Sequence, residues 1–143
     1  MRPTVLMRLE LTRRTDYAVR AALVLAHRPG ETVSGSEIAR QTAIPVRFVT
    51  QVMTSLVRSG MVSAVIGRAG GYRLADEPDS VTILAIVEAA EGMPRRTQCA
   101  LRTGPCPGPT TCAIHHVFAA ARESFVAELG RWTLASVAAG EVV

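Results

Sequence analysis

The sequence predicts a mainly α-helical protein that contains one short β-hairpin. Three observations support this fold class. Apolar residues recur at helical spacing along most of the chain. One segment alternates in the way of a β-strand, and a glycine-rich turn follows it directly. Finally, 48% of the 143 residues are apolar, which is enough to fill one hydrophobic core.

The first helix is expected over residues 16–27. Val19 and Leu23 lie on one face at the spacing of an amphipathic helix. The side chain of Thr12 or Thr15 is available as its N-terminal cap. An Arg-Pro-Gly sequence then ends the helix, because proline removes a backbone donor and glycine allows the chain to reverse.

A second helix is expected to begin at Ser36 and stop at Ala43. A third helix follows with Pro45 in its first turn, and Ser59-Gly60 ends it. The polar side of the third helix carries Arg47, Thr50, Gln51, Thr54, Ser55 and Arg58. Two short helices joined by a tight turn are typical of a helix-turn-helix, which lays its last helix in the DNA major groove. A plain three-helix bundle has similar periodicity and remains an alternative.

A β-hairpin is predicted directly after the third helix. Residues 61–66 form its first strand, residues 67–71 its turn and residues 72–74 the returning strand. A hairpin in this position is a wing, so the predicted architecture is a winged helix-turn-helix. The glycine-rich tip allows close approach to DNA, and Arg68 is placed to enter the narrow minor groove. The alternative is a hairpin that packs on the helices and leaves Arg68 in solvent.

Two more helices are predicted in the C-terminal half. The first covers residues 82–90, with Ser80 or Thr82 as its cap. The second runs from residue 113 to about residue 130 and carries a regular apolar stripe of Ile114, Val117, Phe118, Ala121, Phe125 and Leu129. We expect a second copy of the chain to cover this stripe, which makes this a long dimerisation helix. Packing against its own domain is the alternative.

The chain is therefore expected to divide into two parts. Residues 1–78 form a winged helix-turn-helix DNA-binding domain. Residues 79–143 contain the dimerisation helix and a loop with the three cysteines Cys99, Cys106 and Cys112, called the cysteine loop below.

The two halves of the chain differ in net charge. Residues 1–75 contain 11 Arg and 4 acidic residues, a net charge of +7, whereas residues 76–143 contain 5 Arg and 8 acidic residues, a net charge of −3. Nucleic acid is the first candidate partner of such a basic half. Solvated arginines on helix faces are the alternative.

Other classes of protein fit the sequence poorly. We find no apolar segment long enough to span a bilayer and no secretory signal near the start, so we expect a cytoplasmic protein with no membrane partner. The sequence has no glycine pattern for nucleotide binding, no paired carboxylates in a plausible pocket and no nucleophile-base motif. We therefore do not expect an enzyme.

Three cysteines lie within fourteen residues, at Cys99, Cys106 and Cys112. The Cys-x2-Cys pair that is usual for structural zinc is absent, and the wider spacing suits a bulkier iron–sulfur cluster. Three thiolates leave a fourth ligand position, which His115 or Asp16 of a partner subunit is able to fill. Unligated thiols, and a zinc or redox-thiol site, remain alternatives.

Several segments are similar to a known family. They are residues 7–12, residues 15–20 on the first helix, residues 44–56, Gly70-Gly71-Tyr72 in the wing, the cysteine loop and Trp132-Thr133-Leu134. Together they resemble the IscR/NsrR-type winged-helix regulators, also called the Rrf-two family. Because family members commonly begin at a Met-x-Leu-Thr-like segment, Met7 competes with Met1 as the start.

The resemblance implies a homodimer that binds palindromic double-stranded promoter DNA. It also implies a 2Fe-2S or 4Fe-4S cluster on the three cysteines, which changes DNA affinity in several members. Asp16 matches the carboxylate that the nitric-oxide sensors take from the partner subunit, and His115 matches the histidine used by regulators of cluster assembly. One departure is in the wing, where Ile66-Gly67 replaces the usual Arg-Gly and displaces the arginine to Arg68.

The resulting hypothesis is a transcriptional repressor whose DNA affinity is controlled by an iron–sulfur cluster that senses nitric oxide or redox state. Arg47, Thr50 and Gln51 are expected to reach base edges. Phe48 is either a core residue or a contact to a thymine methyl group. The alternatives are a regulator of cluster-assembly genes and a DNA-binding regulator that uses zinc or redox thiols.

Overall fold

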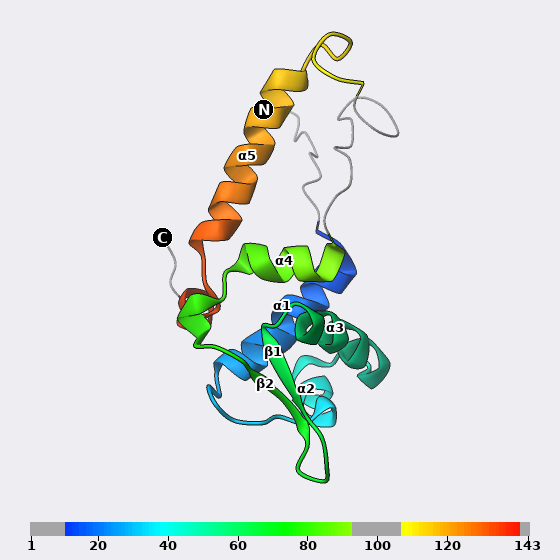
Figure 1. Cartoon of the computed structure of the whole chain (residues 1–143), viewed down its shortest axis with the longest axis vertical. Coiled ribbons are helices and arrows are strands. Elements are labelled where there is room, and N and C mark those ends of the chain that lie inside the picture. The colour runs from blue at the N-terminus through cyan, green and yellow to red at the C-terminus, as the bar shows by residue number, and fades with distance from the viewer. Residues whose placement is uncertain (1–10, 93–106, 141–143) are drawn as a thin grey trace, which may run out of the picture.

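The computed structural model describes residues 11–92 and 107–140 (Figure 1). The elements in these residues are α1 (Arg13–Ala26), α2 (Gly35–Thr42), α3 (Val46–Arg58), β1 (Val62–Val65), β2 (Gly71–Leu74), the 3-10 helix η1 (Pro78–Ser80), α4 (Ile83–Glu91), α5 (His115–Arg131) and α6 (Leu134–Ala138). The predicted fold class, a mainly helical chain with one antiparallel hairpin, is confirmed.

Local caps and backbone restrictions set where the first three helices begin. The Thr12 hydroxyl accepts a hydrogen bond from the backbone N–H of Thr15, so α1 begins directly after Thr12 and three residues before the predicted start. The Ser34 hydroxyl accepts from the N–H of Glu37 in the same way at α2. Pro45 is the N-cap of α3 and lies just before the first turn in which it was expected.

The wing is attached to the helices by a third extended segment. In the hairpin, β1 and β2 are antiparallel, with Val62 opposite Leu74. Val33, between α1 and α2, pairs with Tyr72 through two backbone hydrogen bonds of 2.8 Å each. A Cβ at Gly71 would overlap the carbonyl oxygen of Val33, so only glycine allows this approach. The pairing therefore fixes the hairpin against the helix-turn-helix.

One hydrophobic core joins elements from both halves of the chain. Its largest fully buried apolar side chains are Leu25, Ile38, Val49, Val52, Met53, Leu56, Ile86 and Leu134. Ile86 belongs to α4 and Leu134 to α6, and both helices pack against α1. Elements after residue 78 thus complete the core of the winged domain, and the division between residues 78 and 79 stays a prediction.

The long helix α5 extends away from this core, at the end of the molecule opposite to the wing (Figure 1). None of its residues is buried, and Val117 and Phe118 are 71% and 39% exposed. The short helix α6 then turns back onto α1 and begins with a capping box between Thr133 and Ser136. Helix α6 was not predicted from the sequence, although this capping box is a signal for it. In the described part of the chain, no helix has the length and apolar character needed to cross a membrane.

Candidate nucleic-acid interface and cysteine loop

Helix α3 has one buried side and one exposed side. Val49, Val52, Met53 and Leu56 are buried. The exposed side carries Val46, Arg47, Thr50, Gln51, Thr54 and Arg58. The side chains expected to read bases therefore lie in solvent. Since α3 contains no acidic residue, this face carries only positive charge of its own.

Phe48 connects the exposed face of α3 to α1. Its ring packs against Tyr17 with 5.8 Å between ring centroids, and the guanidinium of Arg47 lies 4.6 Å from the Phe48 centroid. Phe48 is half-buried in this contact. The ring therefore packs between the helices and also orients Arg47 by a cation–π contact. Its contact with a thymine methyl group stays a prediction.

The two threonine hydroxyls on the exposed face bond to their own helix. The Thr50 hydroxyl donates to the carbonyl of Val46 at 3.1 Å, and the Thr54 hydroxyl donates to the carbonyl of Thr50 at 2.8 Å. Each hydroxyl has one proton, so in this rotamer its oxygen is left as an acceptor. Thr50 is therefore suited to accept a hydrogen bond from a base amino group.

Glu37 organises the polar surface of α2. Its carboxylate accepts hydrogen bonds from Arg40 at 2.8 and 2.6 Å and from Gln41 at 2.7 Å, and it lies 3.8 Å from the guanidinium of Arg28. The hydrogen bonds from Arg40, and then that from Gln41, lower the pKa of Glu37 to about 2. Glu37 is thus ionised near neutral pH and holds Arg40 on α2.

The tip of the wing presents one basic and one apolar side chain. Arg68 is exposed in the turn between β1 and β2. Ile66, two residues earlier, is 98% exposed and is the departure from the family pattern noted in the sequence. Between them Gly67 has a φ of 117°, a conformation that favours glycine. The structure therefore confirms that Arg68 lies at the tip of a hairpin, and its contact with the minor groove stays a prediction.

A groove of about 350 Å³ lies between α1 and α3. It is lined by Arg13, Arg14, Tyr17, Phe48, Gln51 and Val52. Arg14 reaches across and donates a hydrogen bond to the hydroxyl of Ser55 at 2.6 Å. Arg13 and Arg14 were not predicted as site residues and entered only the net charge of the first half. The signal in the sequence that could have identified them is that the two arginines are adjacent at the start of the first helix.

The described part of the cysteine loop ends at the start of α5. The N–H of Cys112 donates to the carbonyl of Gly108 at 3.1 Å, and the N–H of His115 donates to the carbonyl of Cys112 at 3.3 Å. Cys112 is half-buried, and the His115 ring meets the ring of His116 edge to face at 5.4 Å between centroids. Cys112 and His115 are thus brought together within one turn. The described residues contain no group of three potential metal ligands.

The other two predicted cysteine ligands, Cys99 and Cys106, lie outside the described residues. Asp16 lies on the exposed side of α1, where its carboxylate forms an ion pair with Arg20 at 3.2 Å. Arg20 also donates a hydrogen bond to the carbonyl of Thr42 at the end of α2. The Asp16 carboxylate is therefore accessible, but it already has a cationic partner within its own chain.

These features define a winged helix-turn-helix protein with an exposed, basic third helix, which is the architecture of a DNA-binding transcriptional regulator. A family profile described as "Rrf2: Iron-dependent Transcriptional regulator" matches residues 11–140. The chain belongs to the Rrf2 family, which confirms the resemblance found in the sequence. Its relatives and structural neighbours are transcriptional regulators and not enzymes.

Curated relatives cover most of the chain. The regulator NsrR of Bacillus subtilis is 30% identical over 128 residues, which are 88% of this chain and 88% of that protein. Protein rrf2 of Nitratidesulfovibrio vulgaris is 27% identical over 130 residues, or 90% of this chain and 87% of the relative. The regulator IscR of Aliivibrio salmonicida is 32% identical over 108 residues, which are 75% of this chain and 64% of the relative.

Solved structures share the fold. CymR, the global cysteine regulator of B. subtilis, superimposes with a TM-score of 0.77 at 23% identity and covers 94% of this chain and 100% of its own. The IscR of T. potens gives a TM-score of 0.72 at 24% identity, with 93% of this chain and 89% of that chain covered. The winged fold with its C-terminal helix is thus that of known regulators.

Proposed function

We propose that this regulator is a cytoplasmic homodimeric repressor whose hold on palindromic promoter DNA depends on an iron–sulfur cluster, with nitric oxide or a redox change as the signal. Cys99, Cys106 and Cys112 would hold a 2Fe-2S or 4Fe-4S cluster, with Asp16 of the partner subunit or His115 as the fourth ligand. Thiolates are the usual ligands of such clusters, and histidine replaces them in some. The iron dependence in the family's description supports this assignment.

The observation that carries the proposal is the position of the cysteine loop in the chain. The loop follows α4, whose last residue, Glu91, accepts hydrogen bonds from the Thr12 N–H at 2.9 Å and the Thr15 hydroxyl at 2.7 Å. Its last cysteine, Cys112, lies three residues before the first residue of α5, His115. A change in the loop thus acts on the start of α1 at one end and on α5 at the other.

Both ends of the loop lead to parts that decide DNA binding. Helix α1 packs on the recognition helix α3, so a shift of α1 moves the side chains that face the bases. The uncovered apolar surface of α5 is the proposed dimer contact. The two recognition helices of a dimer must lie about 34 Å apart, one turn of DNA, so a small change in this contact lowers affinity.

When bound, the cluster supplies iron that reacts with nitric oxide or changes its oxidation state. The chain's own part is to hold that iron with three thiolates and to transmit the change in the loop. The candidate ligand Asp16 is itself connected to the helix-turn-helix. Asp16 has to release Arg20 before it binds iron, and Arg20 also bonds to the end of α2.

Anaerobic purification tests the proposal. We expect coloured protein that contains iron and sulfide, and a shift of promoter DNA that changes after exposure to nitric oxide. Replacing Cys99, Cys106 or Cys112 with Ala should remove both the colour and the response. Colourless, zinc-loaded protein, or cysteine variants that keep the colour and the response, would contradict the proposal.

A second set of variants identifies the fourth ligand. His115→Ala is compared with His116→Ala, which removes the neighbouring imidazole and serves as the matched control. Asp16→Ala is compared with both. The variant that alters the absorbance spectrum of the iron-loaded protein marks the ligand. If none of the three alters the spectrum, neither Asp16 nor His115 is the ligand.

A further inference from the structure

We propose that the groove between α1 and α3 binds the sugar-phosphate backbone of DNA, and that Arg13 and Arg14 each contact a phosphate there. The inference rests on the DNA-binding role of α3, and it assigns a second contact surface beside the one that reads bases. The groove has a volume of about 350 Å³ and lies directly beside the exposed face of α3.

The lining of the groove matches the chemistry of a nucleotide backbone. Tyr17, Phe48 and Val52 provide an apolar surface, and Arg13 and Arg14 add two positive charges. A backbone presents the same combination, because an apolar deoxyribose alternates with a charged phosphate. Contacts from arginine to phosphate add affinity and fix the register of a protein on the duplex without reading sequence.

Arg14 is already held in place for such a contact. Its guanidinium donates a hydrogen bond to the Ser55 hydroxyl of α3 at 2.6 Å. A guanidinium has five N–H donors, so further donors remain for a phosphate oxygen. Because the side chain is fixed before DNA arrives, less conformational entropy is lost on binding.

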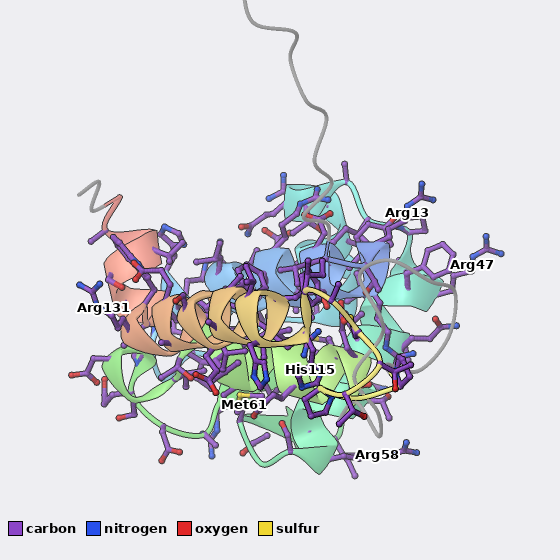
Figure 2. All side chains as sticks on the ribbon, turned by 90° about the horizontal axis from the view of Figure 1, so that it is seen from above. Arg13, Arg47, Arg58, Met61, His115 and Arg131 are labelled. Atoms are coloured by element: carbon purple, nitrogen blue, oxygen red, sulfur yellow. The ribbon has the colours of Figure 1, made fainter. Side chains whose placement is uncertain are left out.

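The groove is continuous with the face that reads bases. Gln51 belongs to both surfaces, and Arg47 lies over the Phe48 ring that lines the groove. Arg13 and Arg47 point to the same side of the molecule, whereas Arg131 lies on the opposite side (Figure 2). A duplex that enters along α3 therefore passes the groove.

The described acidic groups at this end of α1 have other partners. Asp16 forms its ion pair with Arg20, and Glu91 accepts hydrogen bonds from Thr12 and Thr15. None of the described residues that line the groove is acidic. Its positive charge is therefore available to an anion.

The test is the salt dependence of binding to a fluorescent duplex of about 30 base pairs with a random sequence, measured by anisotropy between about 50 and 300 mM salt. The logarithm of the association constant falls linearly with the logarithm of the salt concentration. Arg13→Ala and Arg14→Ala should each make this slope less steep by about 0.9 per protomer, and each should lower the affinity about eightfold at 0.1 M salt. Arg131→Ala is the matched control, since it removes an exposed arginine on the opposite side, and it should keep the wild-type slope. Thermal unfolding of each variant checks that it is folded.

Ser55→Ala separates positioning from charge. It frees Arg14 without removing a charge, so the slope should stay at the wild-type value while affinity falls about threefold. If the wild type binds with a clear salt slope but Arg13→Ala and Arg14→Ala keep that slope, the groove proposal is wrong and DNA binding by α3 stands. If the wild type itself shows no salt-dependent binding, the DNA-binding role on which the inference rests is wrong.

Discussion

The Glu91 carboxylate links the last turn of α4 to the first turn of α1. The hydroxyl of Thr15, a residue that is 1% exposed, donates to it at 2.7 Å, and the N–H of Thr12 donates at 2.9 Å. The hydrogen bond from Thr15 is the main reason that the pKa of Glu91 lies below its usual value, because it favours the ionised form. A pKa lowered by folding stabilises the folded state at neutral pH, and this contribution is lost as the pH falls from the unfolded value through the folded one.

We therefore predict that Glu91→Ala lowers the free energy of unfolding by about 1 kcal/mol at pH 7, the usual effect of losing such hydrogen bonds. Glu91→Gln keeps an acceptor oxygen and cannot ionise. The stability difference between wild type and Glu91→Gln should therefore shrink as the pH falls below about 4.3, the ordinary value of a glutamate. Urea unfolding at a series of pH values measures this. A difference that stays constant down to about pH 3 would contradict the prediction.

Two glycines near the wing make a matched pair of substitutions. At Gly71 a Cβ would overlap the backbone carbonyl of Val33, whereas at Gly35 it would meet only the Tyr72 ring at an ordinary 3.6 Å. We predict that Gly71→Ala lowers the free energy of unfolding by about 2 kcal/mol or more, because backbone has to move. Gly35→Ala, at the start of α2, should be neutral or stabilising by about 0.5 kcal/mol. Urea unfolding of the two variants measures these free energies. Equal losses of stability would show that the close approach of Gly71 to Val33 does not hold the wing in place.

At the scale of the element, α3 has a buried side and an exposed side. Some hydroxyl donors of the exposed side already bond to carbonyl groups of the helix itself. The Thr50 hydroxyl donates to the carbonyl of Val46, so it is left to accept from DNA. Adenine and cytosine present amino hydrogens in the major groove, whereas guanine presents only acceptors at its own edge. A contact from Thr50 should therefore favour a base with an amino group.

We predict that Thr50→Val lowers discrimination at one base-pair position by about 1 kcal/mol, whereas Thr50→Ser keeps it. Binding sites are first selected from a library of random duplexes, and the affinities of single-base variants are then compared. The size and branching of valine match those of threonine, so a loss of stability is not expected to interfere. If Thr50→Val keeps the wild-type preference at every position, Thr50 does not read a base.

At the scale of the whole molecule, α5 is a long helix whose apolar stripe is not buried by the described residues. None of its residues is buried, and Val117 is 71% exposed. The guanidinium of Arg122 lies 4.8 Å from the centroid of the Phe118 ring, and Phe118 remains 39% exposed. An exposed apolar surface of this kind marks an interaction site, and a second copy of the chain is the partner that we propose.

We predict that Val117→Asp yields a monomer in analytical ultracentrifugation, because it places a charge on the exposed apolar surface of the proposed contact. Binding to a palindromic duplex should weaken by at least about tenfold, since two linked half-sites are no longer bound together. Glu123→Ala, on the opposite face of α5, is the control and should leave the assembly unchanged. A Val117→Asp protein with the mass of the wild-type assembly would show that α5 is not the contact.

Much of the fold was accessible from neighbouring residues alone. The caps Thr12 and Thr82 were each one of two predicted candidates, and the buried side of α3 and a hairpin within residues 61–74 were predicted as well. Caps and periodicity depend on residues a few positions apart. For the candidate site, the sequence identified the exposed side chains of α3 and placed Arg68 at the wing tip. Their roles stay predictions.

Tertiary structure decided the contacts between distant segments. The pairing of Val33 with Tyr72, the bond from Arg14 to Ser55 and the bond from Thr15 to Glu91 join residues that are tens of positions apart. No local pattern encodes such pairs, since they form only when packing of the core brings the helices together. The sequence by itself therefore determined which side chains face outward on each element, and the packing of α1 against α3 and α4 determined which of them share a surface.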